Sequence, residues 1–278
     1  MSTQTGSVEM AIIQANNGQT GRRPADGDKL SRLQRNLALP LLLLLAWEAS
    51  AHLGLVNPHV LPPVEDVIGR GWHEFAQGDL ATSLGASLAR DLIGFAIGAA
   101  SGTAAGLVVG FSQLAQRIFG PTLRVHRQIA LFAWVPLIAV WFGAGETGKV
   151  IFIALAAFQP SLINTWRGVQ EIPHRYRELA AVLTFSRFDF LRFIAIPAIL
   201  PALFTGLKAA LIYAWQATVG AELFMTIAPG IGGVMMQGRQ LFQMDLVLLA
   251  ILLLGLIGAG FNSLAAVSET LLLRRRTS

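Results

Sequence analysis

The chain has 278 residues, of which 54% are hydrophobic and 13% charged, and its mean hydropathy is +0.57. Soluble domains carry a much larger share of charge, so the composition predicts an all-α protein that crosses a membrane several times. The net charge of +5 does not indicate nucleic-acid binding, because the basic residues lie at the ends of apolar runs. The sequence has no cysteine, which excludes disulfides, thiol catalysis and cysteine-ligated metal sites.

The N-terminal region combines a polar segment with a first apolar run. Residues 1–30 are rich in Ser, Thr, Gln, Asn and Gly and are predicted to be a disordered cytoplasmic N-terminus. The transmembrane domain is expected over 31–272, and 273–278 form a basic tail. The first predicted span is 37–56, in which Glu48 and His52 share one helix face. This pair is interpreted either as a proton or substrate site or as a helix-packing pair.

A glycine ladder marks the second predicted span, 92–110, which follows a proline-containing segment expected on the outer surface at 57–87. Glycine recurs in it at every fourth residue. Such a ladder lets a neighbouring backbone approach closely, in a membrane where packing holds helices together. The sequence therefore predicts a helix-packing seam at Gly94, Gly98, Gly102, Gly106 and Gly110.

Two predicted spans contain proline. They are 128–143, interrupted at Pro136, and 150–164, interrupted at Pro160, and a basic connection at 111–127 precedes them. Between them, 143–150 reads GAGETGKV and resembles a phosphate-binding loop, but Val150 stands where the loop needs Ser or Thr to hold Mg²⁺. No strand precedes it. We therefore expect no nucleotide site here, and any ATP must be hydrolysed by another chain.

The segment 167–200 contains five arginines and no uncharged run long enough to span a membrane. Apolar residues recur in it at helical spacing, which predicts two short amphipathic helices joined near 184–187. An ordered, basic, half-apolar hairpin outside the bilayer is typical of a docking surface.

At these residues the chain resembles the permease subunits of bacterial ATP-binding-cassette importers. Their shared motif is Glu-Ala-Ala, three residues, Gly, nine residues, then Ile-x-Leu-Pro. The matching residues here are Glu178, Leu179, Ala180, Thr184, Ile194, Ile196 and Pro197. The resemblance implies that this hairpin couples the chain to an ATPase subunit. Thr184 departs from the motif glycine, so the turn is either not left-handed or strained.

The fifth predicted span, 202–224, places charged and aromatic residues on one helix face. Lys208, Trp215 and Glu222 lie within one arc together with apolar residues. Our hypothesis is that this face lines a path for an anionic substrate with an apolar body, and that Trp134 also contributes to the path. The alternative is that Lys208 and Glu222 extend to opposite membrane surfaces.

A glycine-rich outer loop is expected at 226–244 and a sixth span at 245–264. Sixteen of the 21 Lys and Arg residues lie in 1–36, 111–127, 167–200 and 267–278. Because positive residues collect on the cytoplasmic side, the hairpin and both termini are predicted to be cytoplasmic.

The resemblance extends over about 35–270, where segments beginning at Asn164, Leu207 and Gly230 are similar to the aliphatic sulfonate, taurine and nitrate branch. It implies a non-catalytic inner-membrane permease that binds no cofactor. Two copies would pair with two ATPase subunits and an extracytoplasmic solute-binding protein. The expected cargo is a small anion, with aliphatic sulfonate or taurine favoured. A secondary transporter or channel is the alternative, whereas no intramembrane-enzyme motif is present.

Overall fold

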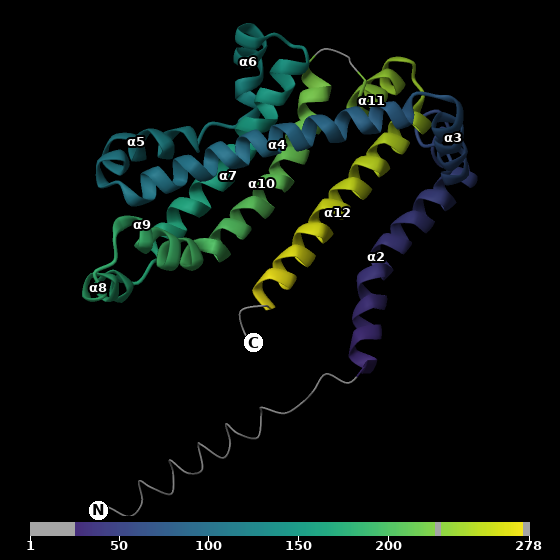
Figure 1. Ribbon diagram of the computed structural model, residues 1–278. Helices are drawn as coiled ribbons and strands as arrows, with labels where there is room; N and C mark the ends of the chain where they lie inside the picture. Colours follow the sequence, from purple (N-terminus) through teal and green to yellow (C-terminus); the bar gives the residue numbers. More distant parts are fainter. Residues whose placement is uncertain (1–25, 226–228, 275–278) are drawn as a thin grey trace, which may run out of the picture. The chain divides into compact units, whose positions relative to one another are not determined.

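The computed structural model describes residues 26–225 and 229–274, and their regular elements are helical. The described residues up to 63 form one unit, which contains α2 (Asp26–His52), and those from 64 onward form a second. The second unit contains α3 (Val64–Gln77), α4 (Leu80–Phe111), α5 (Gln113–His126), α6 (Val135–Phe142), α7 (Glu146–Gln170), α8 (His174–Val182), α9 (Arg187–Asp189), α10 (Ile196–Phe224), α11 (Ile231–Gln240) and α12 (Met244–Arg274) (Figure 1). The predicted all-α class is confirmed.

Four stretches of the described chain are long and apolar enough to cross a membrane. They are Leu80–Phe111, Glu146–Gln170, Phe190–Phe224 and Met244–Ala266. A fifth is possible if α5 and the following Leu131–Phe142 count as one span, although the two are bent by 98°. The apolar part of α2, Ala38–His52, is shorter than a span. The chain is therefore polytopic, with fewer straight spans than the six that the sequence suggests.

The most extensive helix packing joins α4 to α7 along the glycine ladder (Figure 1). A Cβ atom added at any of the five glycines would lie within 3.0 Å of an α7 atom. At Gly98 and Gly102 that atom is a backbone carbonyl oxygen, of Ala154 and Phe158. Because the backbones touch directly, no side chain fits between them.

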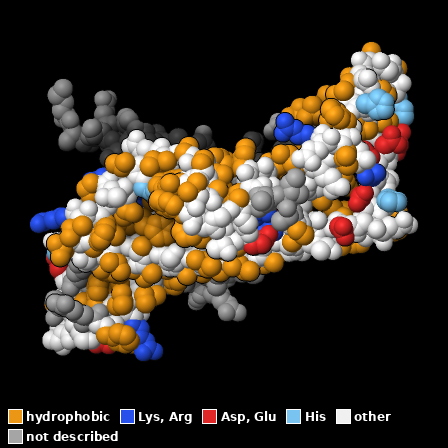
Figure 2. Space-filling model, turned by 90° about the horizontal axis from the view of Figure 1, so that it is seen from above, with side chains coloured by type: hydrophobic (Ala, Val, Ile, Leu, Met, Phe, Trp, Pro, Cys, Tyr) orange, Lys and Arg blue, Asp and Glu red, His pale blue; other side chains and the backbone are white. Residues whose placement is uncertain are grey.

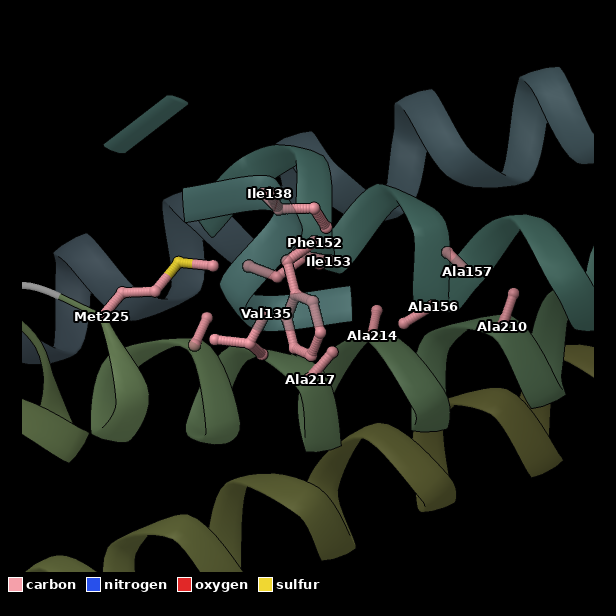
Figure 3. Close-up of a cluster of buried hydrophobic side chains, with 11 residues drawn as sticks. Val135, Ile138, Phe152, Ile153, Ala156, Ala157, Ala210, Ala214, Ala217 and Met225 are labelled. Carbon is pink, nitrogen blue, oxygen red and sulfur yellow. The ribbon is translucent and has the colours of Figure 1, made fainter. Parts of the chain in front are cut away.

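On its other side α7 packs against α10, with α6 completing the core. Figure 3 shows the Phe152 side chain of α7 lying between Val135 of α6 and Ala217 of α10. Both Phe152 and the α10 alanines at 210, 214, 217 and 221 are fully buried. The small alanine side chains of α10 thus leave room for the Phe152 ring of α7.

Several predicted boundaries were wrong. Helix α4 begins at Leu80, twelve residues before the predicted span, because polar residues in its first turns find buried partners. The connection at 111–127 is the helix α5, whose first turn is capped by Ser112 accepting from the Ala115 amide. The predicted outer loop contains α11.

The prolines and termini also differ from prediction. Pro136 lies at the start of α6, where a proline costs no helical hydrogen bond, and α7 continues through Pro160. Residues 26–30, expected to be disordered, are the first turns of α2, while 1–25 and 275–278 lie outside the described residues. In Figure 2 hydrophobic side chains cover much of the visible surface, as lipid contact requires.

We predict that Gly98→Ala destabilises the protein, because its Cβ would meet the Ala154 carbonyl oxygen and force α4 and α7 apart. Overpacking of this kind costs about 1–3 kcal/mol. Gly85→Ala, in the same helix with nothing within 4 Å of the new Cβ, is the matched control and should be neutral or stabilising. Thermal unfolding of the purified variants measures the difference, and equal melting temperatures would contradict the tight seam.

Candidate functional site

The hairpin begins where α7 ends and contains the coupling-motif residues. Its helix α8 ends at Val182 and is followed by a left-handed residue, Thr184, at φ +52°. The Phe185 amide donates to the Ala180 carbonyl at 2.9 Å, the six-residue bond of a Schellman motif. Thr184 therefore occupies the left-handed position that the family motif fills with glycine. Its Cβ makes this conformation cost about 1–2 kcal/mol more than glycine would.

The next helix starts with a local cap. Ser186 accepts the Asp189 amide through Oγ, and the Asp189 carboxylate accepts the Ser186 amide in return. This reciprocal pattern resembles a capping box and fixes the chain direction directly after the left-handed turn. The turn is thus specified on both sides by hydrogen bonds.

The sequence predicts a separate short helix in the second half of the hairpin, and this prediction was wrong. From Arg187 the chain is α9, then a π-helical segment (Phe190–Ala195), then α10 without a break. Ile194 lies in the π segment, and Ile196 and Pro197 form the first turn of α10. A displacement of the hairpin therefore acts directly on a membrane-spanning helix.

Much of the hairpin surface is exposed and apolar. Ala180 is buried, whereas Glu178, Leu179 and Thr184 are exposed. Further exposed hydrophobic residues are Val182, Leu183, Phe185, Phe188 and Phe193. The His174 Nδ1 and Glu178 Oε1 atoms lie 3.0 Å apart, and both side chains are exposed. This combination of apolar and charged groups suits protein contact.

A charge network joins α4, α7, α10 and the start of α11; its members Arg90 and Glu222 are buried, whereas Glu146 is exposed. Arg90 of α4 binds both oxygens of Glu146 through Nε and Nη2, each at 2.7 Å, and it also donates to Glu222 of α10. Ser87 donates to Glu222 at 2.6 Å, and the Gly232 amide donates to it at 2.8 Å. Glu222 is thus held by one cation and two further donors, as a buried carboxylate requires.

The network extends to the first residue of α11 and to the two residues before it. The Ile231 amide donates to Ser87 Oγ at 2.9 Å, and Arg90 Nη2 donates to the Pro229 carbonyl at 3.1 Å. Gly230 is also packed on Glu222, since a Cβ there would meet the carboxylate. These bonds fix the short helix α11 to the spans on either side.

Two more buried charges lie beside this network. Asp91 is fully buried and accepts the Thr218 hydroxyl at 2.9 Å. Lys149 is fully buried, with Nζ 3.8 Å from Glu146 Oε1. In the sequence, Lys149 belongs to the segment 143–150, which resembles a phosphate-binding loop. In the structure the glycines make a turn, with Gly143 at φ +82°. Glu146 belongs to the charge network, and Lys149 lies beside it.

The candidate pathway residues occupy three different environments. Trp215 is buried, donates its indole N–H to the Leu254 carbonyl of α12 at 3.1 Å, and packs on Phe261. Glu222 belongs to the charge network, and Lys208 is half-buried in a pocket between α4, α10 and α12. Trp134 packs on the separate α6–α7–α10 core and on His126. The predicted face of α10 therefore points into protein along its length.

Sequence reasoning missed Ser87, Arg90, Asp91, Glu146 and Thr218. One signal was available: a charged residue in or beside a span needs a partner, and Glu222 fell inside the fifth predicted span while Arg90 lay two residues before the second. Their separation by 132 residues hid the pairing. In the first unit, the predicted contact between Glu48 and His52 is present at 2.9 Å.

The chain belongs to the binding-protein-dependent transport system inner membrane component family, whose model matches residues 96–278. It is thus the permease component of an ATP-binding-cassette importer, a multi-pass inner-membrane subunit that is not catalytic and binds no cofactor itself. Importers of this family also require an ATPase and a binding protein.

The relatives of this chain are named for several different transported molecules. The chain is 32% identical to SsuC of Bacillus subtilis, named as an aliphatic sulfonates transport permease, over 92% of each chain. It is 31% identical to the taurine permease TauC of Escherichia coli, over 78% of this chain and 80% of the relative. It is 36% identical to the riboflavin permease RibX of Chloroflexus aurantiacus, over 87% and 91%.

Among solved structures, an inward-facing form of the MetNI methionine ABC transporter matches with a TM-score of 0.55 and 16% identity. The match covers 70% of this chain and 98% of the other. This likeness shows that the two share a fold.

We predict that Arg90→Gln lowers the free energy of unfolding by about 3–5 kcal/mol, because it leaves Glu222 charged and buried without its cation. Glu222→Gln in the same chain should restore part of the loss, since it removes the unpaired charge. Arg117→Gln, at an exposed arginine of α5, is the control. Thermal unfolding measures all four proteins, and an unchanged melting temperature for Arg90→Gln would contradict the network.

Proposed function

We propose that this chain is the membrane-spanning subunit of an importer for a small anionic solute, and that the ATPase subunit docks on the hairpin at 167–200. The observation that carries the docking site is the turn at Thr184. It has the left-handed geometry of the family glycine, on an exposed segment that connects α7 to α10. ATP binding by the partner then moves the hairpin, and the hairpin moves α7 and α10.

The stoichiometry follows from one hairpin per chain. Two copies of this chain related by a two-fold axis would serve two ATPase subunits. The exposed apolar residues of α8 and α9 provide the contact area, with Glu178 and Arg192 as charged groups at its margin. In this arrangement the path for cargo opens alternately to each side of the membrane.

The orientation is proposed from charge. The hairpin, the basic connection that became α5, and both termini carry most of the Lys and Arg residues, which favours the cytoplasmic side for all of them. The Arg90 network and α11 then lie toward the outer side. There the binding protein would deliver cargo beside a firmly held α11.

For the cargo, we propose an aliphatic sulfonate or taurine. The support is the relative named for aliphatic sulfonates, which aligns over 92% of both chains, together with the taurine relative. Lys208 supplies a positive charge inside a span, where charged groups normally face a pathway or a partner.

We predict that Glu178→Arg abolishes ATP-driven uptake and weakens binding of the ATPase, because it reverses an exposed charge at the docking surface. Its side chain is 69% exposed, so the melting temperature of the isolated chain should not change. Uptake into proteoliposomes and co-purification of the ATPase are the two measurements.

Thr184→Gly is the matched control within the same hairpin. It restores the family residue at a position that is already left-handed, so the variant should assemble and transport at least as well as the original chain. Full uptake by Glu178→Arg would rule out the proposed docking surface.

A further inference from the structure

Helix α3 carries an apolar face that the rest of the described chain leaves exposed. The face is formed by Ile68, Trp72 and Phe75, and Trp72 at its centre is 77% exposed. At 100° per residue, these three side chains lie within an arc of about 60°. A contiguous exposed apolar surface of this kind meets either lipid or another protein. The position of α3 and the chemistry of its other faces favour lipid.

Helix α3 packs against the first turns of α12. Val67 is buried, and a Cβ atom added at Gly71 would lie 2.9 Å from Leu249 Cδ1. Leu249 is five residues after the first residue of α12, about 8 Å along the helix. The apolar span Met244–Ala266 is about 34 Å long, just enough to cross the hydrocarbon core. Helix α3 therefore lies close to the boundary between the hydrocarbon core and the headgroups.

Polar contacts hold α3 at this level. Arg70 donates through Nη2 to Gln243 Oε1 at 3.0 Å. Its Nε atom lies 3.2 Å from Glu74 Oε1 and 3.9 Å from Asp245 Oδ2. Gln243 and Asp245 stand on either side of the first residue of α12, and α4 begins three residues after α3 ends. Helix α3 is thus fixed to the starts of two membrane-spanning helices.

The third face of α3 is polar. Asp66 and His73 are exposed there, about 130–150° around the helix from the apolar face. A helix with one apolar and one polar face lies in the plane of the membrane interface, where tryptophan side chains also collect. We infer that α3 lies in this interface, with Ile68, Trp72 and Phe75 among the lipids of the leaflet in which α4 and α12 begin.

The turn before α12 supports this placement with a further aromatic residue. Phe242 has φ +54°, and its side chain is 80% exposed. A left-handed conformation is unfavourable for a bulky residue. The next residue, Gln243, is bonded to Arg70 of α3, so Phe242 lies at the level of α3. Insertion of its ring into lipid gives this strained, exposed position a physical reason.

The partner is the apolar boundary of the bilayer and not anionic headgroups. Helix α3 has three carboxylates, on Glu65, Asp66 and Glu74, against the one arginine, Arg70. Attraction to anionic lipid therefore contributes nothing, and burial of the apolar side chains drives the contact. The proposed orientation makes this the outer leaflet. The inference goes beyond the proposed function, because it holds whichever cargo the protein carries.

The test is a nitroxide scan of α3 in nanodiscs of phosphatidylcholine. The chain has no native cysteine, so each single-cysteine variant can be labelled at one position and then assembled with the ATPase. Ile68→Cys, Trp72→Cys and Phe75→Cys place the label on the apolar face. Asp66→Cys and His73→Cys, at exposed positions on the polar face of the same helix, are the matched controls. Electron paramagnetic resonance measures the collisions of each label with oxygen, which concentrates in lipid, and with a water-soluble nickel chelate.

Labels at 68, 72 and 75 should collide more with oxygen than with the nickel chelate, and the order should be reversed at 66 and 73. Nickel access at all five positions would place the apolar face in water and overturn the inference. Low access to both reagents at 68, 72 and 75 would show that a protein, such as a second copy or the binding protein, covers this face, and would also overturn it. If Trp72→Cys fails to assemble, the labels at 68 and 75 decide.

Added phosphatidylglycerol identifies the kind of lipid contact. The oxygen and nickel profiles should be the same with and without this anionic lipid. Oxygen access at the apolar face that appears only with phosphatidylglycerol would contradict insertion driven by apolar burial.

Discussion

The contact between the backbones of α4 and α7 is the constraint on which the rest of the second unit depends. Five glycines on α4 face α7 so closely that a single added carbon would collide with it. In a membrane the lipid is as apolar as the side chains, so close packing must hold the helices together. With α7 fixed in this way, its opposite face receives the small residues of α10 around Phe152.

The seam connects the two regions to which we assign function. At one end Arg90 of α4 holds Glu146 at the start of α7 and Glu222 near the end of α10. At the other end α7 leads into the hairpin, and the hairpin returns as α10. Because separating α4 from α7 would lose close packing along all five glycines, we propose that the two helices move together as one rigid body with the hairpin.

The sequence was informative where the signal was local or carried by a motif. The glycine ladder has a fixed period on one helix, and the coupling motif identified the turn at Thr184. The first twelve residues of α4 were missed because polar residues such as Ser87 and Asp91 look unsuited to a span until their partners on α10 are known. Continuity from the hairpin into α10 was missed because a π-helical segment allows the charged hairpin to join an apolar helix without a break.

The candidate pathway residues show the same limit. Helical periodicity correctly placed Lys208, Trp215 and Glu222 on a shared face of α10, but it could not say what each would meet. The partners come from distant parts of the chain: Leu254 for the indole, and Arg90 for the carboxylate. The three residues that were expected to form one binding surface therefore lie in different environments: Trp215 packs between helices, Glu222 pairs with a charge, and Lys208 lines a pocket.

A disulfide between α4 and α7 tests most directly whether these helices stay together during transport. The chain has no native cysteine, so an introduced pair can bond only with each other. A Cβ added at Gly110 lies 2.7 Å from the Cβ of Val169. The Cβ atoms of a disulfide are about 3.8 Å apart, so the two backbones would have to move apart by about 1 Å for cysteines at these positions to form the bond. ATP-driven uptake by Gly110→Cys/Val169→Cys should be the same after oxidation as after reduction. Loss of uptake on oxidation, restored by a reductant, would show that α4 and α7 must separate during transport and would contradict the account.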